Sequence, residues 1–221
     1  YKLVVSLAEQ LIDQGMDLFE STFANVIENE GNEIILRTMN GDFKASRIVY
    51  TTGYERLPYG TMEGADINRS YAIVTEQKPS FEGWYENALV WETARPYLYM
   101  RKTVDNRIII GGLDEKKASP AKHETKVDAM ANSLLDKLHE LLPNETFHAP
   151  YKYCASFGES LDHLPFIGQH PEEPNHYYLL GFGGNGTVYS MLGSKIIADL
   201  IMNRPNADAR LVTLDRKYGI K

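Results

Sequence analysis

Four glycines occur within six residues, at positions 181, 183, 184 and 186, between two segments of different periodicity. Residues 176–180 are mostly apolar and predict a short strand. The residues after the glycines predict a long helix, because apolar side chains recur every four positions at Val188, Leu192, Ile196 and Leu200. A glycine turn between a strand and a helix requires both kinds of element to pack together. The fold class predicted is therefore α/β (α+β).

This turn comprises Gly181, Phe182, Gly183, Gly184, Asn185, Gly186 and Thr187. Because glycine has no side chain, a ligand can approach the backbone closely here. The helix that follows directs unpaired N–H groups and the positive end of its dipole to the same place, which suits a negative charge. The alternative is a tight turn without a ligand. The turn is not a first-strand dinucleotide fingerprint, since no acidic residue follows about 20 residues later at the end of a second strand.

The first part of the chain predicts a helix followed by a small sheet. Leu3, Leu7 and Leu11 form one apolar helix face, and Gly15 is suited to end that helix. A helix, a glycine and a strand would be the second half of a β-α-β crossover. The expected strands are 16–20, 23–28, 33–39 and a last one that runs from the Asn40-Gly41 turn through 48–50.

The middle of the chain predicts an antiparallel sheet that carries one helix. Strands are expected at 71–76, 89–92, 97–102 and 107–112, with a hairpin turn at Asp105-Asn106. Alternation places Tyr97, Tyr99 and Arg101 on one face of their strand. A helix is expected over about 120–142. The charged run 114–117 is interpreted as a solvated face.

The composition excludes several classes of protein. The net charge is −7 without an Arg-rich block or basic stripe, so no nucleic-acid partner is expected. Cys154 is the single cysteine, which favours a reducing, cytoplasmic location, and no Cys/His pair has zinc-ligand spacing. No apolar run approaches the roughly 20 residues of a membrane span. Because Tyr1 opens the chain inside a helix pattern, we expect a piece of a longer protein.

Four motifs in order carry a family resemblance. The segment Ser160-x-Asp162-x-x-Pro165-x-Ile167-Gly168 precedes the glycine turn, and two further motifs lie upstream, Thr51-Thr52-Gly53 and Pro96-Tyr-Leu-Tyr99-x-Arg101 with 107–112. Together they resemble the D-amino-acid oxidase, glycine oxidase and sarcosine oxidase superfamily of flavoproteins.

The resemblance implies a cofactor, FAD, and a division into domains. Residues 1–58 and 158–205 would form an incomplete FAD-binding domain, 59–157 an antiparallel-sheet substrate domain, and 206–221 a C-terminal surface tail. The family's first β-α-β unit, whose turn holds the FAD pyrophosphate, has no counterpart in this sequence, so we expect the chain alone to bind FAD weakly or not at all. Cofactor contacts are expected from Thr52, Gly53, Pro165, Gly168 and the turn, Gly181, Phe182, Gly183, Gly184, Asn185, Gly186 and Thr187.

The resemblance also suggests substrate residues. Tyr99 and Tyr153 form an aromatic wall over the flavin or pack in the core. Several family members hold the substrate carboxylate with an Arg where Phe157 stands here, which puts a simple glycine or D-amino acid substrate in doubt. Arg101 either replaces that Arg or is a solvated strand residue. Asn185 either donates to the flavin, caps the helix, or does both.

The function expected is oxidation of an amine or amino-acid-like small molecule by hydride transfer to FAD. The alternatives are a non-catalytic module that binds a ligand or partner, and a flavin-dependent hydroxy-acid dehydrogenase of related fold. No residue is predicted to be catalytic by itself, and no membrane span is predicted. Self-association through the first or last helix is expected if these helices expose their apolar faces.

Overall fold

The computed structural model describes residues 1–53, 64–79, 84–116 and 124–216. These residues fall into two compact units, Tyr1–Val49 and Tyr50–Lys221. The expected domain boundary at residue 58 and the expected helix start near Pro120 lie outside the described residues. The family division into a cofactor domain and a substrate domain therefore stays a prediction.

The first unit confirms the predicted helix and the two predicted hairpins. Its strands form a meander in the order β1-β2-β3, and both strand pairs are antiparallel. Gly31 and Gly41 allow the two hairpin turns, with φ of 64° and 127°. The elements are α1 (Lys2–Asp13), β1 (Ala24–Glu30), β2 (Glu33–Thr38) and β3 (Gly41–Ala45).

The end of α1 explains why the expected strand at 16–20 is absent. The N–H of Gly15 donates to the Ile12 carbonyl at 2.9 Å, and the N–H of Met16 donates to the Leu11 carbonyl at 3.0 Å. This is a Schellman motif, completed by the left-handed φ of 94° at Gly15. The prediction of a strand at 16–20, and with it half of a β-α-β crossover, was wrong because the helix cap uses the first backbone donor. The expected strand from Gly41 to 50 is also broken, between β3 and β4 (Ile48–Tyr50).

No residue of α1 is buried. Most of its large apolar side chains are exposed, among them Leu3, Leu7 and Leu11. Self-association through this helix stays a prediction.

The second unit contains the predicted antiparallel sheet, with strand order β6-β7-β8-β5-β9. Every neighbouring pair in it is antiparallel. Its turn at Asn106, with φ of 56°, confirms the predicted hairpin between β7 and β8. The elements are β5 (Ala65–Val74), η1 (Tyr85–Asn87), β6 (Val90–Trp91), β7 (Leu98–Lys102), β8 (Ile108–Glu115) and β9 (Tyr151–Ser160).

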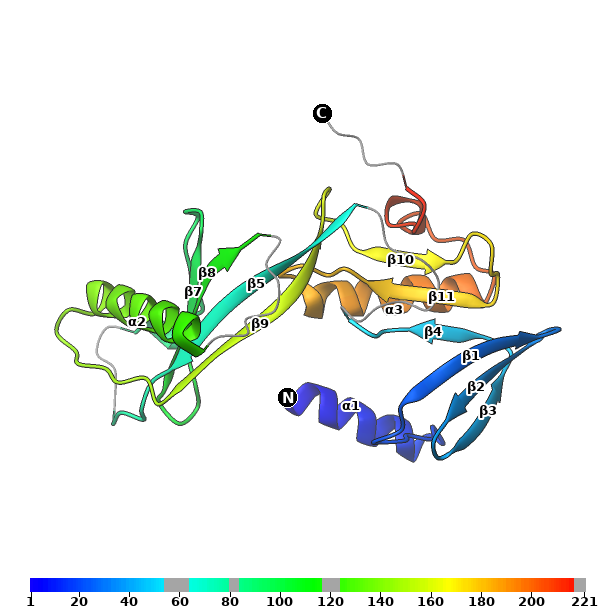
Figure 1. Ribbon diagram of the computed structural model, residues 1–221, viewed down its shortest axis with the longest axis horizontal. Helices are drawn as coiled ribbons and strands as arrows, with labels where there is room; N and C mark the ends of the chain where they lie inside the picture. Colours follow the sequence, from blue (N-terminus) through cyan, green and yellow to red (C-terminus); the bar gives the residue numbers. More distant parts are fainter. Residues whose placement is uncertain (54–63, 80–83, 117–123, 217–221) are drawn as a thin grey trace. The chain divides into compact units, whose positions relative to one another are not determined.

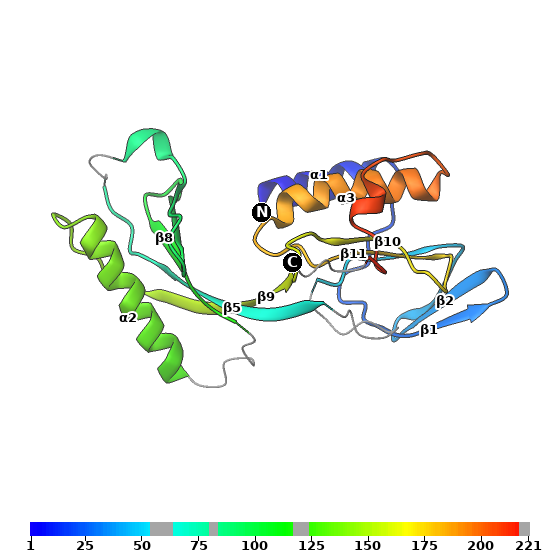
Figure 2. The ribbon, with the colours of Figure 1, turned by 90° about the horizontal axis from the view of Figure 1, so that it is seen from above.

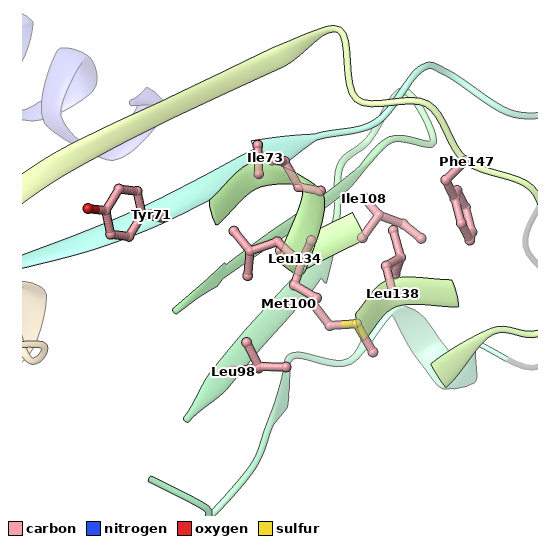
Figure 3. Packing of buried hydrophobic residues seen from close by; sticks show 10 residues of the cluster. Tyr71, Ile73, Leu98, Met100, Ile108, Leu134, Leu138 and Phe147 are labelled. Carbon is pink, nitrogen blue, oxygen red and sulfur yellow. The ribbon is translucent and has the colours of Figure 1, made fainter. Parts of the chain in front are cut away.

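Helix α2 (Glu124–Leu141) packs on one face of this sheet, against β5, β8 and β9 (Figure 1). Figure 3 shows Leu134 and Leu138 of the helix directed at Ile73, Met100 and Ile108 of the strands. All five side chains are buried, and each stabilises the fold by about 1.5–3 kcal/mol through loss of apolar surface to water. The face opposite α2 carries Tyr99 and Tyr153, both of which are exposed; we call it the tyrosine face.

A second, three-stranded sheet has the order β10-β11-β4. Helix α3 lies along β10 and β11 (Figure 2). The approach is close at Gly193, where a Cβ would lie 2.1 Å from the Leu179 side chain. The elements are β10 (Phe166–Gln169), β11 (His176–Leu180), α3 (Gly186–Ile201) and η2 (Ala209–Leu211). The predicted strand and helix on either side of the glycine turn are confirmed.

The expected surface tail, 206–221, stays a prediction, but two residues of its described part, 206–216, are packed. Val212 is buried in the core formed by β10, β11 and α3, and its carbonyl accepts a hydrogen bond of 2.7 Å from the Ile167 N–H. The side chain of Arg216 is only 9% exposed. An apolar residue and an anchored cation hold this segment against β10.

Candidate active site

The glycine turn links the end of β11 to the first residue of α3, and its shape depends on glycine at two positions. Gly181 and Gly183 have left-handed φ of 73° and 52°, which residues with a Cβ rarely adopt. At Gly181 a Cβ would also lie 2.8 Å from the Phe166 ring. Gly184 and Asn185 are exposed at the outer side of the turn.

The turn is fixed to the end of β9. The Gly183 N–H donates to the Gly158 carbonyl at 2.9 Å. Phe182 forms an isolated β-bridge with Glu159. These contacts bring the turn, predicted as cofactor-facing, against the last residues of the strand that carries Tyr153 and Phe157.

The turn also approaches β7. A Cβ built on Gly184 would lie 3.6 Å from the Tyr97 hydroxyl, an ordinary contact distance. Tyr97 immediately precedes β7, which carries Tyr99. The structure thus places the glycine turn and the tyrosine face beside one another within the second unit.

Asn185 occupies the N-cap position of α3, but its side chain makes no capping hydrogen bond. Of the two roles considered for Asn185, the side-chain cap is thus not formed, and donation to the flavin stays a prediction. Gly186 and Thr187 form the first turn of α3, where backbone N–H groups have no partner within the helix.

Two of the residues expected to contact the cofactor, Pro165 and Gly168, are buried. Pro165 immediately precedes β10, and Gly168 lies within it, opposite Tyr178 of β11. The turn meets Phe166, whose ring lies 2.8 Å from the position that a Cβ on Gly181 would take. Contact of Pro165 or Gly168 with the cofactor stays a prediction.

The loop before β10 is held by a pair that the sequence did not reveal, Arg216 and Asp162. The guanidinium donates to both carboxylate oxygens of Asp162 at 2.7 and 2.9 Å. It also donates to the carbonyls of Leu164 and Pro165 at 2.7 and 2.9 Å. Its hydrogen bonds are the first cause that lowers the pKa of the Asp162 carboxyl below its ordinary value of 3.8.

Thr52 and Gly53 lie two and three residues after the end of β4, the strand next to β11 in the second sheet. Both are exposed, and Gly53 has a left-handed φ of 67°. Their place after a strand of this sheet is the one expected for the Thr-Thr-Gly motif.

The tyrosine face contains one row of four residues across neighbouring strands. Tyr99 of β7 pairs with Gly111 of β8, Gly111 with Ala72 of β5, and Ala72 with Tyr153 of β9. A Cβ on Gly111 would lie 2.5 Å from the Tyr99 hydroxyl, so the Tyr99 ring crosses Gly111. Two small residues therefore lie between two tyrosines. Of the two interpretations of these tyrosines, an aromatic wall fits their exposure better than core packing.

Arg101 and Phe157 flank this row. Arg101 is exposed and lies two residues after Tyr99, on the same face as predicted, opposite Ile109 of β8. Phe157 pairs with Asn68 near the end of β9 and is half-buried. Phe157 is closer than Arg101 to the glycine turn along the sheet, because Gly158 holds that turn.

The sequence interpretation missed Asp114. The run 114–117 was expected to be a solvated face, but Asp114 and Glu115 belong to β8 and are half-buried. Glu115 turns toward α2, where Lys126 binds it at 2.6 Å. Lys117 lies outside the described residues. The pair Gly111-Gly112 inside a strand was the available signal, since glycines there often mark an irregularity in the strand.

Burial is the main cause that raises the pKa of the Asp114 carboxyl above its ordinary value of 3.8. Burial likewise raises the pKa of the Tyr97 and Tyr99 hydroxyls above 10.0. Perturbed titratable groups that gather in one place are typical of functional sites. All three lie on or beside the tyrosine face.

Two further properties concern the described residues only. None of their helices combines the length and the apolar character needed to cross a membrane. They contain no cluster of three or more His, Cys, Asp or Glu side chains suited to a metal ion.

Cys154 is a free thiol and packs against the core under α2, as expected for a small apolar side chain.

This combination of a glycine turn and an antiparallel sheet defines a known fold. The crystal structure of glycine oxidase from Geobacillus kaustophilus superposes with a TM-score of 0.77 at 21% identity, over 98% of this chain and 58% of that chain. The structure of L-proline dehydrogenase from P. horikoshii superposes with a TM-score of 0.75 at 18% identity, over 95% of this chain and 57% of that chain.

Residues 1–200 match the family described as FAD dependent oxidoreductase (DAO), and the chain belongs to this family. Glycine oxidase of Bacillus subtilis is 23% identical over 100% of this chain and 58% of its own length. A probable oxidoreductase, OrdL, of Rhizobium meliloti is 25% identical over 92% of this chain and 46% of its own length. The chain thus spans about half to three-fifths of the length of these relatives.

Proposed function

We propose that this chain belongs to an FAD-dependent enzyme that oxidises an amine or amino-acid-like small molecule. The observation that carries the proposal is the contact between the glycine turn and the tyrosine face. The Gly183 N–H donates to the Gly158 carbonyl at the end of β9. Elements suited to a cofactor and elements suited to a substrate are therefore adjacent in one unit.

The residues present fit the flavin end of FAD. Exposed Gly184 and Asn185 offer backbone and amide donors without a bulky side chain in front of them. The N-terminus of α3 adds a positive partial charge at the same place. A bound flavin would supply the chemistry, by accepting a hydride from the carbon next to the substrate nitrogen.

The chain's own side chains would position that substrate. The exposed rings of Tyr99 and Tyr153 flank a floor made by Gly111 and Ala72. Such a site holds an apolar substrate chain between aromatic side chains and excludes water from the reacting carbon. The turn donors and Asn185 would stabilise negative charge at the electron-rich end of the cofactor.

The test is anaerobic reduction of the flavin-loaded enzyme that contains this chain. Loss of the flavin absorbance after addition of primary or secondary amines supports the proposal. A colourless purified enzyme would favour the alternative of a binding module. Bleaching by 2-hydroxy acids and not by amines would favour the hydroxy-acid dehydrogenase.

The 221-residue chain alone should bind FAD weakly or not at all, and a calorimetric titration that shows tight binding would overturn this. We propose a cytoplasmic location for the enzyme because the single cysteine of this chain, Cys154, is a free thiol.

A further inference from the structure

Asp114 reaches the tyrosine face because of an irregularity in β8. Leu113 has a left-handed φ of 54°, and the pairing of β5 with β8 shifts register between Arg69 and Tyr71. Leu113 packs against the core under α2. The next side chain, Asp114, therefore lies on the opposite side of the sheet, where Tyr97 and Ser70 are its neighbours.

In the described part of the chain, one oxygen of the Asp114 carboxylate lacks a hydrogen-bond donor. Its Oδ1 atom is buried and accepts no hydrogen bond. The Ser70 Oγ atom, close to both Asp114 and Tyr99, is also buried and forms no well-directed hydrogen bond with the described residues. The hydroxyls of Ser70 and Tyr97 are close enough to lower the carboxyl pKa, yet they form no well-directed hydrogen bond to Oδ1. A buried acceptor left in this state favours binding of an added donor.

The charges near Asp114 also favour a cation. The negative charge of Glu159 raises the pKa of the Asp114 carboxyl, and the positive charge of Arg95 lowers it. The Arg95 guanidinium lies over the Tyr97 ring, 4.7 Å from its centroid, and forms no ion pair with Asp114 among the described residues. The negative charge of Asp114 is thus not neutralised by a direct contact.

The aromatic side chains near Asp114 suit an organic cation, because Tyr97 and Tyr99 lie beside the carboxylate and Trp91 packs against Tyr97. The ring centroids of Trp91 and Tyr97 are 5.9 Å apart, and those of Tyr97 and Tyr99 are 6.2 Å apart. Tyr97 already holds one cation on its face, that of Arg95. Aromatic faces attract ammonium groups through the ring quadrupole, and a nearby carboxylate adds an opposite charge.

We infer that Asp114 is a specificity-determining residue for a substrate that carries a second ammonium group in addition to the nitrogen next to the oxidised carbon. The inference rests on the proposed function, because it uses the tyrosine face as the substrate site. The substrate class is therefore a diamine or a similarly basic amine. The second ammonium group binds Asp114 beside Tyr97 and Tyr99.

Three probes of equal chain length separate the possibilities. They are 1,4-diaminobutane, butylamine without a second charge, and 4-aminobutanoate with a carboxylate in place of the second amine. Binding to the flavin-loaded enzyme is measured by calorimetry, and flavin reduction is followed anaerobically. The expected order of affinity is diaminobutane, then butylamine, then 4-aminobutanoate.

Asp114→Asn keeps the shape of the side chain and removes its charge. We expect it to weaken diaminobutane binding about tenfold or more, to leave butylamine nearly unchanged, and to improve 4-aminobutanoate. Asp114→Glu should restore part of the preference. The matched control is Asp136→Asn, at an exposed position on α2, which should change none of the three affinities.

The outcomes keep the inference apart from the proposed function. Equal effects of Asp114→Asn on all three probes, or a wild-type preference for 4-aminobutanoate, would overturn the inference even while amines bleach the flavin. Failure of every amine to bleach the flavin would overturn the proposed function, and calorimetry would still show whether diaminobutane needs Asp114. If Asp114→Asn does not fold, the wild-type affinities test the inference: tighter binding of diaminobutane than of butylamine supports it, and the reverse order contradicts it.

Discussion

The hydroxyl end of the Tyr99 side chain lies over Gly111, only 2.5 Å from the position that a Cβ on this glycine would take. The neighbouring Gly112 has a different constraint. It has a left-handed φ of 137°, and a Cβ there would lie 2.2 Å from the Tyr97 backbone oxygen. The two adjacent glycines thus have different roles. Gly111 leaves room for the Tyr99 ring at the candidate site, whereas Gly112 allows a left-handed backbone conformation close to the backbone of Tyr97.

Substitution of Gly111 by alanine should mainly weaken amine binding, whereas substitution of Gly112 should mainly lower the free energy of unfolding. Gly111→Ala should fold with a loss of about 1 kcal/mol or less, because the ring end can rotate away, but it should weaken amine binding by displacing Tyr99. Gly112→Ala should lose about 1–3 kcal/mol or more, because backbone atoms clash. Urea unfolding measures stability, and calorimetry with an amine measures the site. Equal stability of the two variants would contradict the assignment.

Alanine scanning of the glycine turn should separate its shape from its function. Gly181→Ala should destabilise the protein by about 1–3 kcal/mol, since the new Cβ meets the Phe166 ring at 2.8 Å and φ is left-handed. Gly184→Ala should cost no more than about 0.5 kcal/mol, because its Cβ would make only an ordinary contact. In the flavin-loaded enzyme, however, Gly184→Ala should weaken flavin binding about tenfold, measured by release of flavin fluorescence. Unchanged flavin affinity would argue against the turn as a cofactor contact.

Local sequence patterns predicted most of the elements. The helix ending at Gly15, the hairpins at Gly41 and Asn106, and the strand and helix around Gly181 each depend on periodicity and turn chemistry within a few residues. The strand expected at 16–20 failed for a physical reason, because a strand needs a partner and the Schellman motif had already used the N–H of Met16.

The candidate site was predictable only in part. Glycines 181 to 186 and the alternation of Tyr99 and Arg101 are visible along the chain. Asp114 and Arg216 are not, because their roles depend on contacts between distant segments. A shift in strand register brings Asp114 to the tyrosine face, and Arg216 reaches Asp162 across 54 positions of sequence. Periodicity carries no information about such convergence.

The core between α2 and the large sheet should respond to truncation at Leu134. This side chain is 0% exposed, so Leu134→Ala should destabilise the protein by about 2–5 kcal/mol through lost contacts and a cavity. Leu141→Ala is the matched control in the same helix, at a side chain that is 51% exposed, and should change stability by about 0.5 kcal/mol at most. Denaturant unfolding followed by circular dichroism measures both. Similar losses for the two variants would refute this packing.

The ion pair of Arg216 with Asp162 should anchor the segment after η2 to the loop that precedes β10. Arg216→Met keeps the apolar part of the side chain but removes all of its donors. It should destabilise the protein by about 1.5–3 kcal/mol at neutral pH, since the Asp162 carboxylate and the Leu164 carbonyl lose charge-assisted hydrogen bonds. Arg204→Met, at an exposed position, is the control and should have little effect. Limited proteolysis should release the end of the chain faster only in Arg216→Met.

The ion pair of Arg216 with Asp162 should also make the stability of the fold depend on pH in the acidic range. Hydrogen bonds from Arg216 are the first cause that lowers the pKa of the Asp162 carboxyl in the folded protein below its ordinary value of 3.8. A carboxyl with a lowered pKa in the folded state stabilises the fold fully above its unfolded pKa, and this contribution disappears as the pH falls through the folded pKa. Below pH 3.8 the wild type should therefore lose stability more steeply than Arg216→Met, which has already lost the interaction. Thermal unfolding between neutral pH and strong acid tests this, and the difference in Tm between the two proteins should narrow as the pH falls. A difference that stays constant with pH would show that Arg216 acts through packing and not through Asp162.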